Sequence, residues 1–283
     1  MWNIVTRHWA SIVGSVLAGF GVLFLFIESY EVITNKEVNL NFAVFLALSI
    51  ACGILYFILD GKVLTGFLKK QIELPSHLFS GETVTVKFGN FFDEVGWKSV
   101  AVNDFFDDLI DDVVISKSSI HGQVVSEFWA NDVTDLRSQL DLSLQRYKPR
   151  NSPRSVGKSL RYPVGSTAVL KRRGESFIFF ALGHTDIRSN ETSATVSTLV
   201  EAVRGLLKTA RTVCSGQPLV LPLVGSGLAR VGIPEQAIAQ IILTALLEES
   251  RDAKITSDIC LVLPISCVGN ISLNQILQQW TQK

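Results

Sequence analysis

The sequence predicts two apolar transmembrane helices followed by an α/β domain of three layers with a largely parallel or mixed sheet. Three observations lead to this fold class. Residues 9–27 and 38–59 contain no Asp, Glu, Lys or Arg, and beyond residue 60 the composition is that of an ordinary globular domain. In that second part, short β-branched runs alternate with longer helical segments, a pattern typical of α/β domains.

Each apolar run is long enough to cross a lipid bilayer. The 19 residues of the first run extend roughly 28 Å as a helix, close to the ~30 Å hydrocarbon core. This run exceeds the usual apolar region of a signal peptide, about 7–15 residues, and no A-x-A-like cleavage site follows it. We therefore predict a transmembrane helical hairpin over residues 1–60, with spans at about 9–27 and 38–59.

The charges that flank the hairpin predict its orientation. Arg7 precedes the first span, lysines follow the second, and the loop between them carries mainly glutamates. The positive-inside rule then places both termini in the cytoplasm of a multi-pass protein. Gly14, Gly19 and Gly21 allow helices to approach closely. The hairpin is either a plain anchor or part of a pore, and a pore would need a homo-oligomer because two helices cannot enclose a channel.

Residues 61–80 are predicted to form a connector, and residues 81–283 the soluble domain. Its length allows a sizeable core. Asp132 is a plausible N-cap. The strands are predicted at 82–88, 98–103, 166–170, 176–182, 219–224 and 259–263, and the helices at 119–130, 132–147, 191–211, 234–250 and 271–279.

Two stretches of opposite charge stand out in the soluble domain. Residues 146–173 hold nine Lys or Arg and no acid, and residues 93–112 hold seven acids and one Lys. The basic stretch is predicted to be a loop, either solvated and flexible or in contact with anionic headgroups, a charged ligand or a partner. The two stretches could also pair with each other.

Other chemistry is not indicated by the sequence. The four cysteines lack metal-ligand spacing, and we interpret them as reduced thiols. His121 and His184 are isolated, so no catalytic triad is predicted. No metal, cofactor or nucleic-acid partner is expected.

The most informative motif is Leu221-Pro222-Leu223-Val224-Gly225-Ser226-Gly227-Leu228-Ala229-Arg230. A buried strand leads into a loop with two glycines separated by one residue. Such a loop can turn its backbone N–H groups toward one anion, because glycine permits close approach and positive φ. It is neither a Walker A loop nor a good dinucleotide fingerprint.

Together with its neighbours, this loop resembles the phosphate loop of macro domains. A strand that ends in Asn103, a helix that begins at Ser118-Ser119-Ile120-His121-Gly122-Gln123, and Gly89-Asn90-Phe91 after an earlier strand follow the macro-domain layout over about residues 80–283. The resemblance implies a macro-like three-layer α/β/α domain. The implied ligand-binding residues are Asn90, Asn103, Ser119, His121, Gly122, Gly225, Ser226, Gly227, Leu228 and Arg230.

With the hairpin added, the chain resembles the membrane-bound macro-domain effectors of bacterial Thoeris anti-phage defence. That resemblance implies a bacterial inner-membrane protein. It implies that a TIR-domain partner consumes NAD and makes an ADP-ribose-derived signal, that the macro domain binds this signal, and that the hairpins then disrupt the membrane. The lipid bilayer and other copies of the chain would be further partners.

The chain departs from the macro-domain pattern at three points. Asn90 stands where an Asp is usual, Asp104-Phe105-Phe106 follows Asn103, and the glycine triplet is reduced to His121-Gly122. These departures favour a specialised ligand, such as an ADP-ribose conjugate, and a binding role without catalysis. The alternatives are a membrane-tethered ADP-ribosyl hydrolase and a scaffold protein with a degenerate nucleotide fold.

Overall fold

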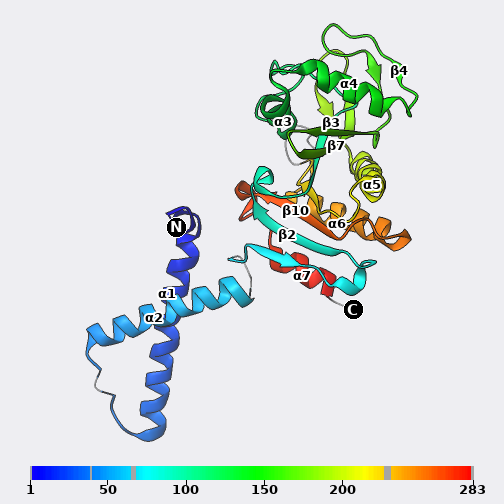
Figure 1. The fold of residues 1–283 in the computed structure, drawn as a ribbon. Coiled ribbons are helices and arrows are strands. Elements are labelled where there is room, and N and C mark those ends of the chain that lie inside the picture. The colour runs from blue at the N-terminus through cyan, green and yellow to red at the C-terminus, as the bar shows by residue number, and fades with distance from the viewer. Residues whose placement is uncertain (1, 39, 65–67, 226–230, 282–283) are drawn as a thin grey trace. The chain divides into compact units, whose positions relative to one another are not determined.

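The structure is a computed structural model that describes residues 2–38, 40–64, 68–225 and 231–281. The chain divides into two compact units, Met1–Lys69 and Lys70–Lys283 (Figure 1). The first unit is helical, and the second is an α/β domain.

The first unit consists of two helices, α1 (Trp2–Thr34) and α2 (Phe42–Leu59). The Asn41 side chain caps α2 by accepting a hydrogen bond from the backbone N–H of Ala43, and a π-helical turn, Asp60–Leu64, follows its end. α1 extends beyond the predicted span in both directions. The segments Ile12–Thr34 and Phe42–Val63 are each long and apolar enough to cross a membrane.

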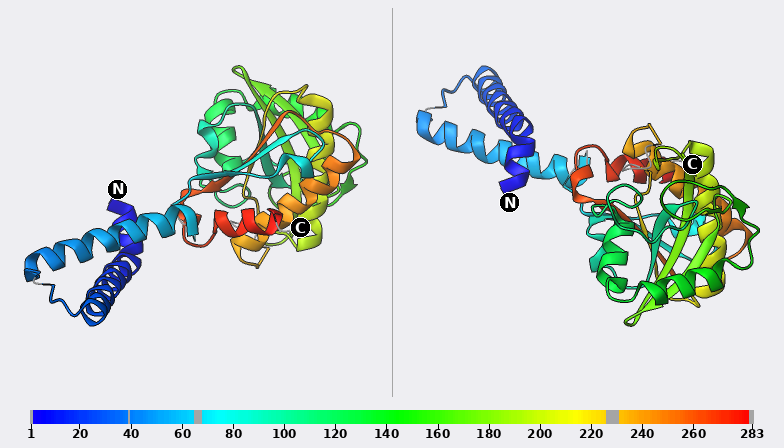
Figure 2. Two further views of the ribbon diagram at one scale, coloured as in Figure 1. Left: turned by 90° about the horizontal axis from the view of Figure 1, so that it is seen from below. Right: turned by 90° about the horizontal axis from the view of Figure 1, so that it is seen from above.

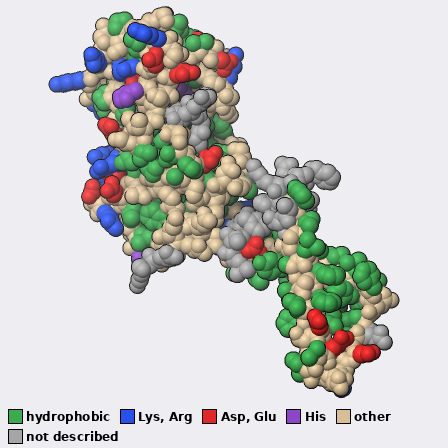
Figure 3. All heavy atoms as spheres, turned by 180° about the vertical axis from the view of Figure 1, so that it is seen from behind, with side chains coloured by type: hydrophobic (Ala, Val, Ile, Leu, Met, Phe, Trp, Pro, Cys, Tyr) green, Lys and Arg blue, Asp and Glu red, His purple; other side chains and the backbone are tan. Residues whose placement is uncertain are grey.

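Small residues let the two helices approach each other closely. A Cβ atom on Gly53 would lie 2.5 Å from Val16 Cα, and one on Gly19 would lie 2.7 Å from Gly53 N. Ser15 and Ser49 are buried between the helices. Large side chains such as Leu17 and Phe26 face outward instead, and hydrophobic side chains cover most of the visible surface of this unit (Figure 3). Such an apolar exterior suits a lipid environment.

Gly53→Val is expected to disturb this helix pair, because its Cβ position is already occupied by the α1 backbone. Overpacking of this kind typically costs about 1–3 kcal/mol. Gly14→Val is the matched control, since nothing lies within 4 Å of a Cβ at that position. The full-length Gly53 variant in detergent should aggregate at a lower temperature than the Gly14 variant. Equal temperatures would contradict the packing.

The second unit is built on an eight-stranded sheet in the order β1-β2-β10-β9-β3-β7-β6, with β8 paired to β7. The inner strands β2, β10, β9, β3 and β7 are parallel, and β1 and β6 are antiparallel edge strands. The predicted mixed α/β sheet is therefore confirmed. The strands are β1 (Gln71–Glu73), β2 (Thr83–Gly89), β3 (Trp97–Asn103), β6 (Thr167–Arg172), β7 (Glu175–Thr185), β8 (Thr192–Ser193), β9 (Leu219–Pro222) and β10 (Asp258–Pro264).

Helices cover both faces of the sheet (Figures 1 and 2). Side chains alternate along β7, so Phe177 and Phe179 pack with α3 and α4, whereas Ile178 and Phe180 pack with α5 and α6. This alternation produces the three layers. The helices are α3 (Ile120–Trp129), α4 (Val133–Leu144), α5 (Val196–Val213), α6 (Glu235–Asp252) and α7 (Leu273–Thr281).

Two differences between the structure and the sequence predictions concern the connector and α5. Residues 70–80, expected to belong to a connector, contain β1 and a 3-10 turn, Ser76–Leu78. α5 begins at Val196 rather than Glu191, because Thr195 and Thr198 form a capping box and residues 192–193 pair with β7 as β8. The predicted N-cap, Asp132, does cap α4 through the backbone N–H of Asp135.

Candidate functional site

The sheet has a topological switch point between β3 and β9. After β3 the chain continues to α3 and α4 on one face, and after β9 it continues to α6 on the other. The two strands pair only at Trp97↔Leu219 and Lys98↔Val220, while β9 continues beside β10. In open α/β sheets, ligands bind in the crevice at the carboxyl ends of strands at such a point. The candidate site is therefore this carboxyl edge of the sheet.

The two predicted asparagines lie at this edge, at the ends of β2 and β3. Asn90 is exposed; its Oδ1 accepts a hydrogen bond from Phe92 N at 3.3 Å, and its Nδ2 donates to Asp93 at 2.9 Å. Asn103 is buried and donates from Nδ2 to Asp107 at 2.7 Å. Its Oδ1 accepts the backbone N–H groups of Phe105 and Asp107. Both side chains thus shape the turns that follow their strands.

The predicted residues Ser119, His121 and Gly122 form the N-terminus of α3. Ser119 Oγ accepts the N–H of Gly122 at 2.9 Å and caps the helix. A Cβ on Gly122 would lie 2.2 Å from the backbone oxygen of Ser116, so this turn requires glycine. A capped helix N-terminus carries a partial positive charge that favours an anion.

His121 is the predicted side chain with unused hydrogen-bonding capacity. It is 6% exposed, its ring meets the edge of Phe179 at 5.4 Å between centroids, and its Nε2 has no hydrogen-bond partner. Burial lowers the pKa of His121 to about 3; the positive charge of Lys158 acts in the same direction and Asp108 opposes it. His121 is therefore neutral near pH 7, with a polar nitrogen buried beside the helix N-terminus.

Acid is expected to destabilise the protein partly through His121. An unfolded histidine titrates near pH 6.5, so between that pH and about 3 the unfolded chain binds a proton that the folded chain does not. The free energy of unfolding should then fall by about 1.4 kcal/mol per pH unit for this one proton. In His121→Phe, the loss of thermal stability between pH 6 and pH 4 should be smaller than in the wild-type chain. Identical losses would mean that His121 is protonated in the folded state.

The glycine loop leaves β9 at the other side of the crevice. Gly225 has a φ of +88°, and the backbone N–H of Val231 donates to the Gly225 carbonyl at 3.1 Å. A Cβ on Gly225 would lie 2.7 Å from Val231 Cγ2. The other predicted members, Ser226, Gly227, Leu228 and Arg230, lie outside the described residues.

The structure also shows a polar cluster that the sequence analysis left open. Residues 148–162, here called the basic strap, contain the short hairpin of β4 (Arg150–Asn151) and β5 (Leu160–Arg161). The side chain of Arg154 is fully buried, pairs with Asp107 and lies 3.9 Å over the Phe105 ring. The backbone N–H of Lys158 donates to the same carboxylate at 2.8 Å. The strap is thus attached to the turn after β3, and the pairing of the two charged stretches, one of the predicted alternatives, occurs within the chain.

A second acid of this turn, Asp108, also binds cations. Arg137 donates two hydrogen bonds to it, at 2.8 and 3.1 Å, and Lys158 Nζ lies 3.2 Å away. Burial by itself would raise the pKa of Asp108, but the hydrogen bond from Arg137 and the charge of Lys158 lower it below its ordinary value. The opposite charges of residues 93–112 and 146–173 were the only sequence signal for this cluster.

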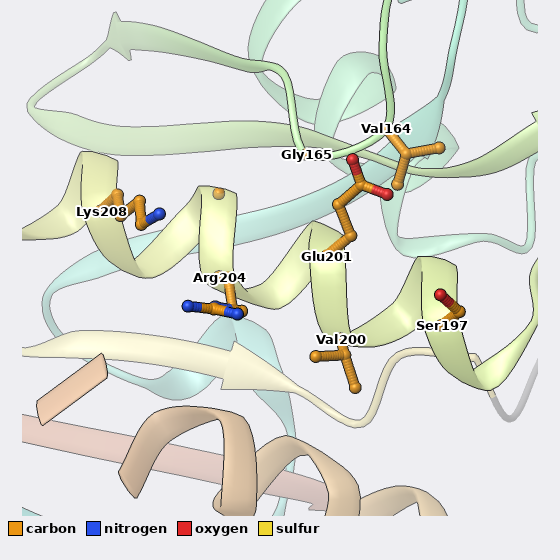
Figure 4. Close-up of a pocket in the computed structure, with 8 residues that line it drawn as sticks. Val164, Gly165, Ser197, Val200, Glu201, Arg204 and Lys208 are labelled. Atoms are coloured by element: carbon orange, nitrogen blue, oxygen red, sulfur yellow. The ribbon is translucent and has the colours of Figure 1, made fainter. Parts of the chain in front are cut away.

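Two shallow hollows lie along α5. The larger one, about 480 Å³, is lined by Val164 and Gly165 and by α5 residues that include Glu201, Arg204 and Lys208 (Figure 4). Arg204 already donates to the buried Glu249 at 2.7 Å. Neither hollow is lined by residues of α3 or by Gly225, and we place the candidate site at the carboxyl ends of β3 and β9.

The fold is that of a macro domain. Two mutant forms of the macrodomain of Oceanobacillus iheyensis share the fold with a TM-score of 0.50. One is 10% identical and covers 75% of this chain and all of its own; the other is 11% identical and covers 74% of this chain and 92% of its own.

The family can be named more closely. The model of the macro domain of Thoeris protein ThsA matches residues 84–264, and the chain belongs to this family. It is similar to the Thoeris protein ThsA of Bacillus amyloliquefaciens (strain Y2), with 27% identity over 157 residues, which are 53% of this chain and 51% of that protein. The chain spans about half the length of this relative.

Proposed function

We propose that this chain is an anti-phage effector whose macro domain binds an ADP-ribose-derived signal, made by a TIR-domain partner, and whose hairpins then disrupt the membrane. Membership of the ThsA macro-domain family supports the defence role. Two helices that are long and apolar enough to cross a membrane support the output. The second unit has the macro-domain fold, in which we expect the ligand to bind at the carboxyl ends of β3 and β9.

One observation carries the binding proposal: two anion-attracting backbone features flank the β3–β9 crevice. The capped N-terminus of α3 follows β3, and the positive-φ turn at Gly225 follows β9. Backbone N–H groups at such turns bind phosphate oxygens without a charged side chain. A pyrophosphate between the two would leave a nucleoside on one side and a second sugar on the other.

The described side chains favour binding over catalysis. Asn90, Asn103 and Ser119 use their polar atoms in local turns. His121 is buried and neutral, so it is suited to accept or donate one hydrogen bond rather than to exchange protons with water. None of these four side chains is therefore placed to activate water, as an ADP-ribosyl hydrolase would require.

Gly227→Glu is expected to weaken ligand binding at least tenfold, about 1.4 kcal/mol. The substitution adds volume and negative charge in the loop expected to hold phosphate. Ala253→Glu is the matched control, because it adds the same side chain at an exposed position after α6. Calorimetry would measure binding of ADP-ribose, and of the products of NAD cleavage by a TIR domain, to the full chain in detergent.

Two outcomes would count against the proposal. Equal affinity of the Gly227 and Ala253 variants would remove the loop from the site. Release of ADP-ribose from an ADP-ribosylated protein by the wild-type chain would favour the hydrolase alternative instead.

A further inference from the structure

A histidine and a buried aspartate lie at the carboxyl end of β7, next to the end of β3. His184 is largely exposed, with 62% of its side-chain surface accessible, and its Nδ1 lies 3.3 Å from Asp104 Oδ2. Asp104 is fully buried. Asn103 pairs with Gly183 across the two strands, so Asp104 and His184 are the next residues on each.

Asp104 is held in place by more than the histidine. Its Oδ1 accepts the backbone N–H of Thr185 at 3.1 Å, and its Oδ2 lies 3.3 Å from Nε of Arg161 on the basic strap. The backbone N–H of Tyr162 donates to the Asp104 carbonyl at 2.7 Å. A carboxylate fixed in this way orients the imidazole that contacts it.

This contact determines what the exposed nitrogen of His184 can do. A neutral imidazole that donates its Nδ1–H to Asp104 carries a lone pair on Nε2. That lone pair accepts a hydrogen bond from a hydroxyl or an amine. It does not bind a phosphate oxygen, which is itself an acceptor.

The position of β7 places His184 within reach of a nucleotide in the crevice. β7 and β9 lie on opposite sides of β3, and neighbouring strands are about 4.8 Å apart. Because β3 and β9 pair only at their first residues, the two strand ends are separated by at least roughly 10 Å. A ligand whose phosphate lies at the Gly225 turn could therefore present a sugar near β7. Sugar hydroxyls are the donors that Nε2 can accept.

We propose that His184 Nε2 accepts a hydrogen bond from a ribose hydroxyl of the nucleotide ligand, and that Asp104 is the positioning residue for this contact. The proposal rests on the proposed function, because it assigns a further contact of the same ligand. It extends the site across β3 to β7, to a residue that the motif resemblance does not include. Arg161, 27% exposed, borders the same position.

The test compares three histidine variants of the full chain in detergent, with ADP-ribose as the probe. His184→Ala should weaken binding about tenfold. His184→Gln, whose amide oxygen can accept the same hydrogen bond, should stay within about threefold of wild type. His77→Ala removes an exposed histidine in the turn before β2 and should bind as wild type does.

The outcomes separate this inference from the proposed function. The His184 contact is overturned if the wild-type chain binds ADP-ribose and His184→Ala leaves this binding unchanged. If Gly227→Glu abolishes binding in the same experiment, the nucleotide site stands. Equal losses in the Ala and Gln variants would also overturn the contact. If the wild-type chain binds neither ADP-ribose nor any product of NAD cleavage by a TIR domain, the proposed function itself fails.

Discussion

Cells that contain this chain and an active TIR-domain partner are expected to depolarise when the partner consumes NAD, and cells without the signal are expected to keep their membrane potential. A ligand shifts an equilibrium only by binding one state better than the other. Moving a gate from 1% to 99% open requires roughly 5.5 kcal/mol of differential binding per gating unit. Several ligands in one oligomer could share that cost.

Two variants serve as controls for this result. Deletion of residues 1–60 removes both apolar helices, and Gly227→Glu removes the proposed phosphate contact while leaving the helices. Both should abolish depolarisation, which a voltage-sensitive dye would measure in intact cells. If the chain without residues 1–60 were equally toxic, the membrane output would be wrong, and an enzymatic role of the macro domain would become the better explanation.

Arg154→Ala is expected to produce the largest loss of stability, about 3–5 kcal/mol. Both side chains of the Arg154–Asp107 pair are almost completely buried, so the variant leaves a carboxylate without its cation inside the domain. Asp107 also holds Asn103 at 2.7 Å, and the turn after β3 should loosen. For a unit of about 200 residues, the expected fall in the unfolding temperature is of order 10 °C.

Arg137→Ala is the matched control for this experiment. Its side chain is 60% exposed, and Asp108 keeps Lys158 as a partner, so the loss should stay below about 1 kcal/mol. Thermal unfolding of the full chain in detergent measures both variants. Similar unfolding temperatures for the two would contradict the structural role of the strap.

The regular elements of the domain could be predicted from the sequence because their signals are local. Alternation of Thr and Val over Thr83–Gly89 has the period of a strand with one buried face, and the structure buries Val84 and Val86. The apolar run before Gly225 has the length of a central strand. The absence of charge over residues 9–27 and 38–59 predicted two long apolar helices.

The remaining features depend on contacts between residues that are distant in the sequence. Arg154 and Asp107 are 47 residues apart, and Asp104 and His184 are 80 apart. No spacing rule joins such pairs. The opposite charges of the two stretches suggested the first pair, and no sequence signal suggested the second. β1 has only three residues, so its own sequence carries almost no strand signal. It forms because the edge of β2 is free to pair with it.

Part of the candidate site could be predicted from the sequence, and part could not. The motif resemblance brought Asn103, the α3 N-terminus and Gly225 together, and the structure places them at one edge of the sheet. The local hydrogen bonds of Asn90 and Asn103 were not predictable, because they depend on how each turn folds after its strand. Because these bonds occupy the asparagine side chains, we expect the backbone and His121 rather than the asparagines to contact the ligand.

Dye release from liposomes tests the central claim most directly. Liposomes would carry the purified full-length chain in their membrane, with its soluble domains facing outward, and would contain a trapped fluorescent dye. The products of NAD cleavage by a TIR domain would then be added outside. We predict that the dye stays inside until the products are added and then leaks, and that liposomes with the Gly227→Glu chain remain sealed. Leakage before any product is added, or sealed liposomes when the wild-type chain has bound the product, would contradict the account.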